Sequence, residues 1–345
     1  MTNAPTPVSL RGKNDPTRLA VTGVGNALLD IVARDPDETY RQHGFERAAM
    51  NLIGAERLEA VYNSMGPTIQ TGGGSVANTI AGVAALGGTA GFIGKVARDE
   101  FGERFRHDLA AMGVDLDLTV VDTSLGVTGR CHVFVGDDAQ RTMATHLGVA
   151  NQLVPSDIRE DLIARSEITF VEGYLYDLPP AKEAIARLAN FAHVHESLLA
   201  LSLSDSFCVD RHRRDFLELI TNDVDVLLAN EHEIKSLFQV DDLASAYDHL
   251  RDIGLLAVVT RGPEGADVLA YDDVVSVAAA DVEHVVDQNG AGDLFAAGFL
   301  FGLALGNDPV MATELGSLCA GEVIKHYGAR PEVDLGALAL EAGLL

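Results

Sequence analysis

The sequence predicts an α/β protein with a three-layer α/β/α arrangement, in which a mostly parallel sheet carries a small β-rich lid. Three observations lead to this prediction. Short apolar runs alternate with helical stretches along most of the chain, which is typical of a parallel sheet covered on both faces. Two stretches, 33–70 and 118–147, interrupt that alternation. Chemically active residues recur where predicted strands end, and open parallel sheets bind ligands at that edge.

The predicted elements alternate from residue 19 onwards. Residues 19–24 form an apolar first strand, and residues 72–87 follow a Gly-Gly-Gly turn with apolar side chains at helical spacing. A strand at 89–93 and a helix at 99–112 come next, and Gly113 is a typical helix stop. Further strands are predicted at 168–172, 199–204, 224–229 and 256–260, and further helices at 181–192 and 231–238.

The two irregular stretches are predicted to form the lid. Residues 33–70 are polar and irregular, whereas 118–147 contain a β-rich patch at 129–135 and a second one at 141–146. We therefore assign 33–70 and 118–147 to a small β lid over one edge of the main sheet. The large domain would consist of 19–32, 71–117 and 148–345, preceded by a polar tail at 1–18.

Composition excludes several classes of function. A chain of 345 residues can bury one large core and a small appendage. The net charge of −26 argues against nucleic-acid binding, and leaves open whether the acidic surface reflects a saline environment. The most apolar long stretch, 76–94, is interrupted by Asn78 and five glycines, so no membrane partner is expected. Three cysteines without metal-ligand spacing favour a reducing, cytoplasmic location.

Residues 287–293, Asp-Gln-Asn-Gly-Ala-Gly-Asp, carry the clearest functional signal. An apolar run at 282–286 predicts a strand before this heptapeptide, and 294–305 predicts a buried helix after it. Free backbone N–H groups at a glycine-rich helix start bind anions, and Asp293 places a carboxylate beside them. This combination suits transfer of a phosphoryl group to an alcohol. The alternative is a common glycine-rich turn in which the aspartate only complements the helix dipole.

Polar residues at other strand ends are predicted to face the same cleft. Asp30 follows the first strand, and glycines 72–74 precede a helix. Asn230 and Glu233 follow the strand that ends at Ala229, and Thr260 ends another. Because parallel strands present their carboxyl ends at one edge, these side chains should converge.

With these segments assembled, the chain resembles the ribokinase-like (PfkB) family of carbohydrate and nucleoside kinases, which have a Rossmann-like sheet. The heptapeptide resembles the C-terminal signature of the family, and 72–86 resembles the N-terminal one. The motifs Asn-x-x-Glu at 230–233 and Thr-x-Gly-x-x-Gly at 260–265 are also similar. Residues 25–30, 203–207 and Asn289 favour the adenosine kinase branch. Gln288 stands where threonine is usual, so phosphate or monovalent-ion binding there can differ.

The resemblance implies a role for each matching residue. Asp293 would be the base. In the turn that begins with Gly290, the backbone N–H groups of Ala291, Gly292 and Asp293 would hold the phosphoryl group. Arg141 in the lid would face the phosphates, or else form a surface salt bridge. Acceptor-binding residues would be Asp30, Asn26, Gly73, Gly74, Asn78 and Tyr174. Nucleotide-binding residues would be Asn230, Thr260, Gly262, Gly265 and Asn289, with Glu233 organising Mg²⁺ through water.

These roles predict an ATP-dependent phosphotransferase that moves the γ-phosphoryl group to a hydroxymethyl group. Adenosine, converted to AMP, is the favoured acceptor. The alternatives are a sugar kinase acting on ribose, fructose or a relative, and a non-catalytic ligand-sensing protein with the same fold. Expected partners are small molecules, with Mg²⁺ and ATP required, a monovalent cation optional, and both a monomer and a homodimer compatible with the sequence.

Overall fold

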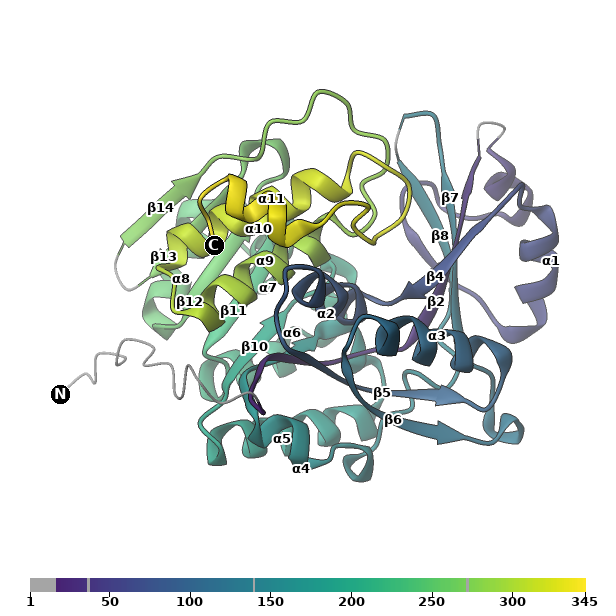
Figure 1. Ribbon diagram of the computed structural model, residues 1–345, viewed down its shortest axis with the longest axis horizontal. Helices are drawn as coiled ribbons and strands as arrows, with labels where there is room; N and C mark the ends of the chain where they lie inside the picture. Colours follow the sequence, from purple (N-terminus) through teal and green to yellow (C-terminus); the bar gives the residue numbers. More distant parts are fainter. Residues whose placement is uncertain (1–16, 36–37, 139, 271–272) are drawn as a thin grey trace.

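The computed structural model describes residues 17–35, 38–138, 140–270 and 273–345, so most of the predicted tail lies outside the described residues. These residues form two sheets (Figure 1). The larger sheet has nine strands in the order β14-β13-β12-β11-β10-β9-β1-β5-β6. Its strands are β1 Leu19–Val24, β5 Ala90–Ala97, β6 Asp115–Val121, β9 Ser166–Glu172, β10 Leu198–Ser202, β11 Val226–Asn230, β12 Leu256–Thr260, β13 Ala266–Ala270 and β14 Asp273–Val277.

Helices cover both faces of the large sheet, which confirms the three-layer arrangement. In the large sheet, the neighbouring strands β6, β5, β1, β9, β10, β11 and β12 pair in parallel. Strand β12 pairs antiparallel with β13, and β13 pairs antiparallel with β14. Successive side chains of β10 pack on opposite faces of the sheet: Ala200 belongs to one apolar cluster, and Leu199 and Leu201 belong to the other. The first cluster contains α2 Ser75–Ala85, α3 Glu100–Ala111, α9 Ala291–Leu305, α10 Pro309–Val323 and α11 Leu335–Glu341. The second contains α4 Glu160–Ala164, α5 Pro179–Val194, α6 Ser206–Asn222, α7 Glu231–Phe238 and α8 Leu243–Ile253.

Side-chain caps determine where several helices begin. Asp99 accepts a hydrogen bond from the Gly102 N–H at the start of α3, and Asp205 accepts one from Cys208 at the start of α6. Asp308 caps α10 and is followed by a proline in the first turn. Each cap satisfies an N–H group that has no partner within its helix, so these boundaries are encoded locally.

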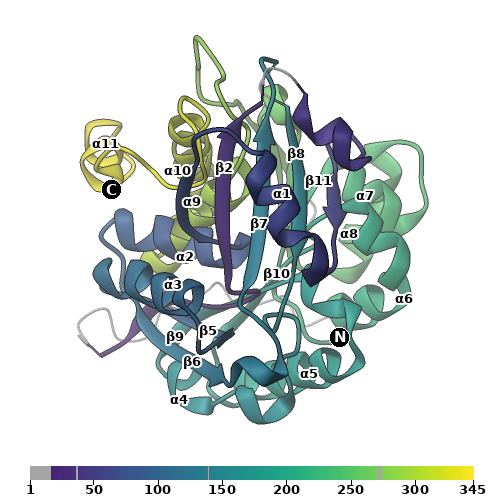
Figure 2. The same cartoon turned by 90° about the vertical axis from the view of Figure 1, so that its right-hand side faces the viewer.

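The smaller sheet has five strands in the order β3-β8-β7-β2-β4. These are β2 Leu28–Arg34, β3 Met50–Leu52, β4 Ile69–Gly73, β7 Gly129–Val135 and β8 Arg141–His146. Figure 2 looks onto this sheet, with α1 Leu58–Ser64 across its outer face. Leu58 and Val61 of α1 pack there against Phe134 and Ala144. The inner face looks towards the carboxyl ends of the large-sheet strands.

The sheets divide the chain differently from the predicted domain boundaries. Strand β2 belongs wholly to the smaller sheet, although residues up to 32 were assigned to the large domain, and β4 runs on to Gly73 rather than stopping at 70. Conversely, residues 118–121 extend β6 of the large sheet. The apolar run continues from β1 into β2, so composition alone does not show that the chain changes sheets between them.

The predicted strand at 282–286 is wrong. These residues form an irregular loop, and the Val286 N–H donates to the Ile324 carbonyl at 2.8 Å at the end of α10. Val285 is 43% exposed. A run of β-branched residues favours extended backbone, but it becomes a strand only when a neighbouring strand offers a ladder.

His132 on β7 provides a pH-dependent test of the small sheet. Its side chain is fully buried beside Tyr62, and burial lowers its pKa to about 4. As the pH falls, the His132 side chain is protonated near pH 6.5 in the unfolded chain but only near pH 4 in the folded chain. The free energy of unfolding therefore decreases as the pH drops from about 6.5 to about 4. Between these limits the wild type should lose about 3 kcal/mol more unfolding free energy than His132→Leu. Urea denaturation at several pH values measures this difference, with the exposed His107→Gln as control; equal pH dependence in wild type and His132→Leu contradicts it.

None of the described helices combines the length and the apolar character needed to cross a membrane.

Candidate active site

One cavity of about 1200 Å³ lies between the two sheets. The carboxyl ends of the central large-sheet strands form its floor, and the inner face of the small sheet forms its roof. Every residue predicted for the site except Gly73 lines this cavity. The tertiary structure therefore brings together segments that are more than 200 residues apart in the sequence.

The heptapeptide forms the start of α9, as expected. Gly290 is the N-cap with φ 78°, and an added Cβ would lie 2.7 Å from the Cα of Ala329, so glycine is required there. The Ala291 N–H donates to the Gln288 carbonyl at 3.3 Å. Among the described residues, the N–H groups of Gly292 and Asp293 have no recorded partner, and an added Cβ on Gly292 would meet nothing within 4 Å. Of the three N–H groups predicted to bind an anion, those of Gly292 and Asp293 are therefore the best placed to do so.

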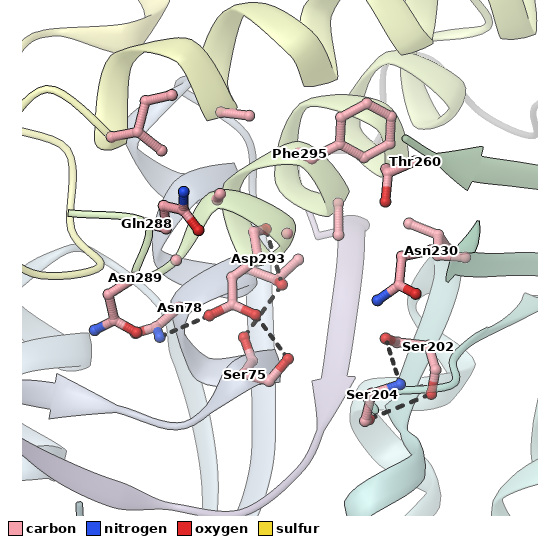
Figure 3. A pocket seen from close by; sticks show the side chains of 18 of the residues that line it. Ser75, Asn78, Ser202, Ser204, Asn230, Thr260, Gln288, Asn289, Asp293 and Phe295 are labelled. Atoms are coloured by element: carbon pink, nitrogen blue, oxygen red, sulfur yellow. Dashed lines mark hydrogen bonds between the residues drawn. The ribbon is translucent and has the colours of Figure 1, made fainter. Parts of the chain in front are cut away.

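Asp293 lies in the first turn of α9 and is held from both sides (Figure 3). Ser75 Oγ donates to its Oδ1 at 2.7 Å, and Asn78 Nδ2 donates to its Oδ2 at 2.9 Å. Burial raises the pKa of Asp293, while the Asn78 and Ser75 hydrogen bonds oppose that rise. The carboxylate is thereby both fixed in direction and made more basic than a solvent-exposed aspartate.

Asp30 lies on β2 and is 7% exposed. Burial raises its pKa to about 7, and the positive charge of Arg330 is the largest opposing influence. Gly73 is glycine because an added Cβ would lie 2.1 Å from the Asp30 Cγ. Gly73, which was expected to bind the acceptor, does not line the cavity, and its lack of a side chain makes room for this carboxylate. Gly74 has φ 99° and an added Cβ would lie 2.1 Å from the Asn26 carbonyl oxygen, so this turn also requires glycine.

Glu172 is a cavity residue that sequence reasoning did not identify. It ends β9, is 1% exposed, and burial raises its pKa to about 7. Its carboxylate accepts hydrogen bonds from the Asn26 N–H at 2.9 Å, from Asn26 Nδ2 at 2.6 Å and from the Val76 N–H at 3.0 Å. The available signal was an acidic residue at the end of an otherwise apolar strand. Glu172 joins the β1–β2 connection to the start of α2 and orients Asn26.

The amides of Asn26 and Asn78 each keep one unused acceptor. Asn26 Oδ1 and Asn78 Oδ1 are buried and have no hydrogen-bond partner among the described residues. Both side chains line the cavity beside Asp30. A ligand with several hydroxyl groups would supply the missing donors.

The Asn-x-x-Glu motif folds into a capping box at the start of α7. Asn230 Oδ1 accepts from the N–H groups of His232 and Glu233, each at 2.9 Å. Glu233 Oε2 accepts from the Asn230 N–H at 2.9 Å, and its Oε1 accepts from Asn230 Nδ2 at 2.6 Å. Within the described residues no group of three or more His, Cys, Asp or Glu side chains could hold a metal ion. This donor set would suit Mg²⁺ only as an ion carried by nucleotide phosphates, which Glu233 would reach through water.

The Thr-x-Gly-x-x-Gly loop borders the same end of the cavity. Gly262 and Gly265 have φ of 57° and 91°, and an added Cβ on Gly265 would lie 2.0 Å from the Val277 carbonyl oxygen. Thr260 ends β12 beside Asn230 (Figure 3). Several small or apolar side chains also line this cavity, namely Ala279, Ala280, Val282, Ala320 and Ile324.

The remaining predicted residues join the lid and the loops around the cavity. Arg141 of β8 donates from Nη1 to the Gln288 carbonyl, and no ion pair of Arg141 is recorded within the described residues. The surface salt bridge considered for Arg141 is therefore not found. Tyr174 donates its hydroxyl to the Ser204 carbonyl at 3.2 Å, and Asn289 is buried with Nδ2 unpartnered among the described residues. The exposed Gln288 also borders the cavity.

A family model described as "pfkB family carbohydrate kinase" matches residues 47–334. The chain belongs to this family. The match confirms the resemblance noted from the signature motifs, and it establishes the coarse chemistry. This pfkB-family protein is an ATP-dependent kinase with an alcohol acceptor.

Solved structures and curated proteins similar to this pfkB-family kinase carry more than one substrate name. The chain is 44% identical to an adenosine kinase from Sinorhizobium meliloti, with a TM-score of 0.90 and coverage of 94% of this chain and 99% of that one. It is 43% identical to a probable sugar kinase from Rhizobium etli, with a TM-score of 0.91 and coverage of 95% and 99%. Adenosine kinase from Saccharomyces cerevisiae is 28% identical over 88% of this chain and 94% of its own length.

Proposed function

We propose that this kinase transfers the γ-phosphoryl group of ATP to the 5′-hydroxyl of adenosine, producing AMP. The observation that carries the proposal is an apolar wall beside Asp30, on the same small sheet and in the same cavity. Side chains of the small sheet and its edges supply this wall, namely Leu28, Met50, Cys131, Val133, Met143 and Leu147. A nucleoside has one hydroxyl-rich end and one flat, largely apolar end, which suits a cavity that offers both polar groups and this apolar surface.

A free sugar suits this wall poorly. Its hydroxyl groups point in several directions, and those placed against apolar side chains lose their hydrogen bonds to water without replacement. The purine ring of adenosine would instead bury apolar area there. The 44% identity to an adenosine kinase supports the same acceptor. A sugar kinase is the second candidate, supported by the cluster Asp30, Asn26 and Asn78, which suits any adjacent hydroxyl groups, and by the likeness to a probable sugar kinase.

In the proposed mechanism, Asp293 accepts the proton of the acceptor hydroxyl as that oxygen bonds to the γ-phosphorus of ATP. The bond between this phosphorus and the β–γ bridging oxygen breaks in the same step, and ADP leaves with the electron pair. Ser75 and Asn78 keep its carboxylate oxygens directed into the cavity. The N–H groups of Gly292 and Asp293 stabilise the negative charge on the transferring group. Mg²⁺ bound to the nucleotide would neutralise phosphate charge, with Glu233 orienting its water. The lid excludes water, which otherwise competes as the acceptor.

The free, buried cysteines support the expected reducing, cytoplasmic setting. Cys131, Cys208 and Cys319 are all unpaired and buried. Burial raises the pKa of each thiol to about 12, so these side chains act as packing groups and not as nucleophiles.

An acceptor screen tests the proposal. We expect kcat/KM for adenosine to exceed that for ribose or fructose by about 100-fold or more, because only adenosine uses the apolar wall. ADP release, measured with adenosine, inosine, guanosine, ribose and fructose at equal ATP, checks this result. A Val133→Asp variant should lower adenosine turnover while leaving KM for ATP near its wild-type value. Rapid turnover of a free sugar with none of adenosine would reject the nucleoside acceptor and leave the kinase assignment intact.

A further inference from the structure

Three consecutive residues after α10 join the two glycine-rich segments of the site. The Gly328 N–H donates to Asp287 Oδ2 at 2.9 Å, and Asp287 Oδ1 accepts from the Asn289 N–H at 2.8 Å. Ala329 packs against Gly290 so closely that no side chain fits there. Arg330 then extends in the other direction, towards the glycine segment at 72–74. Residues 328–330 therefore contact both the anion-binding turn and the acceptor side of the cavity.

The guanidinium of Arg330 is engaged by backbone carbonyls. Its Nε and Nη2 donate to the Gly72 carbonyl at 3.0 and 2.6 Å, and its Nη1 donates to the Ala77 carbonyl at 3.0 Å. On the other side of the same residue, the Gly72 N–H donates to Asp108 Oδ2 of α3 at 2.6 Å. Gly72 is thus held at both its N–H and its C=O. Arg330 does not line the cavity, so it acts from behind the site.

One carbonyl that Arg330 holds lies next to Gly73, which packs against Asp30, and the other lies among the residues that hydrogen-bond Asp293. Gly72 leads directly into Gly73, which packs against the Asp30 carboxylate. Ala77 lies in the first turn of α2, between Ser75 and Asn78, whose side chains hold Asp293. A shift of either carbonyl would therefore move an acidic group of the cavity.

The charge of Arg330 acts on the same two carboxylates. Its positive charge lowers the pKa of Asp30 and that of Asp293, opposing the effect of burial on each. Burial lowers the pKa of Arg330 itself to about 10, which leaves it charged at neutral pH. The other charged groups that influence this set come from α3, β8, β9 and the loop before α9, namely Asp108, Arg141, Glu172 and Asp287.

We propose that Arg330 is a positioning residue of this kinase: by fixing the turn at 72–74 and the first turn of α2, it places Asp30 and Asp293 for the acceptor hydroxyl groups without touching either substrate. The inference rests on the proposed function in taking these two aspartates as the groups that face the acceptor. It goes beyond the signature motifs, because Arg330 lies outside all of them.

The test compares Arg330→Gln, Arg330→Lys and the control Arg187→Gln. Arg187 also donates to a backbone carbonyl, that of Ile158 at 3.2 Å, but it lies outside the cavity. For Arg330→Gln we expect kcat/KM for the acceptor to fall about 10- to 100-fold, with KM for ATP within about two-fold of wild type. The acid limb of the acceptor kcat/KM profile should also move to higher pH, because losing the positive charge raises the pKa of both aspartates.

Arg330→Lys separates charge from geometry. An ammonium group keeps the charge but lacks the planar fork that bonds both carbonyls. The acid limb of Arg330→Lys should therefore stay near its wild-type position. Its KM for the acceptor should be higher than that of the wild type, as we also expect for Arg330→Gln. An Arg330→Gln enzyme that matches Arg187→Gln in acceptor KM and acid limb would overturn the proposal. So would equal rises in the KM of both substrates. If Arg330→Gln does not fold, a wild-type acceptor KM in Arg330→Lys overturns it as well.

The same assays distinguish this inference from the identity of the acceptor. All variants are measured with the best acceptor found for the wild type. If that acceptor is a sugar, the adenosine proposal fails, whereas the shift of the acid limb still decides the role of Arg330.

Discussion

The Asp293→Asn variant is expected to lose about 100- to 10,000-fold in kcat while still binding both substrates. An amide has nearly the same shape as a carboxylate, but it cannot take the proton from the attacking hydroxyl. Ser75 Oγ can still donate to the remaining oxygen, and Asn78 can rotate its amide to present its unpartnered Oδ1 to the new NH₂ group. The loss should therefore fall on the chemical step and not on the architecture of the site.

Single-turnover kinetics and calorimetric binding of acceptor and ATP measure the two effects separately. Ser75→Ala is the matched control, since it removes one hydrogen bond to Asp293 but keeps the base. Its rate should fall far less, and the pKa of Asp293 should rise further because an opposing hydrogen bond is lost. An Asp293→Asn enzyme with unchanged single-turnover rate would exclude the carboxylate as the base. A loss confined to acceptor binding would reassign Asp293 to substrate contact.

Asp30→Asn should lower kcat/KM for the acceptor by about 100-fold or more, with little change in KM for ATP. An ionised carboxylate accepts two hydroxyl donors at once, whereas an amide offers one oxygen and a repelling NH₂ group. Asp30 lies on β2, is 7% exposed, packs against Gly73 and lines the cavity.

The pH dependence of the acceptor step gives an independent check on Asp30. Because burial raises its pKa to about 7, the free enzyme carries increasing amounts of protonated Asp30 as the pH falls through that value. Acceptor kcat/KM should therefore decrease below about pH 7 in the wild type, and Asp30→Asn should lose this component. Asp35→Asn is the control, since Asp35 is a buried carboxylate of the same lid that binds backbone N–H groups and does not line the cavity. A profile of Asp30→Asn that keeps the wild-type acid limb would contradict this assignment.

Local features of the sequence were sufficient for most of the fold. The bounds of β1, β12 and α7 match their predicted ranges, because each apolar run or capping motif contains its own start and stop signals. The signature at 287–293 also predicted a glycine-rich turn into a helix with an acidic residue in its first turn. The start of α9 has this geometry, with Gly290 as the N-cap at positive φ. Such features depend on neighbours within about one helical turn, so they can be read without a tertiary structure.

Features that depend on a distant partner could not be predicted. The run at 282–286 has strand composition but no ladder, and β2 joins the second sheet despite an apolar run continuous with β1. Gly73 reads as a ligand-binding glycine, but the carboxylate of Asp30 occupies the space beside it. In each case the deciding contact is made by a residue that sequence periodicity does not identify.

By itself, the sequence determined the alternation of strands and helices in the large domain, the glycine turns and the acidic group that point to phosphoryl transfer. Only the tertiary structure decided which carboxylates are buried and what restrains them. Glu172 acquires its role from Asn26 and Val76, and Arg330 acquires its role from Gly72 and Ala77, 258 and 253 residues away. The physical reason is that hydrogen bonding and desolvation depend on distances in space, which the fold sets and the spacing along the chain does not.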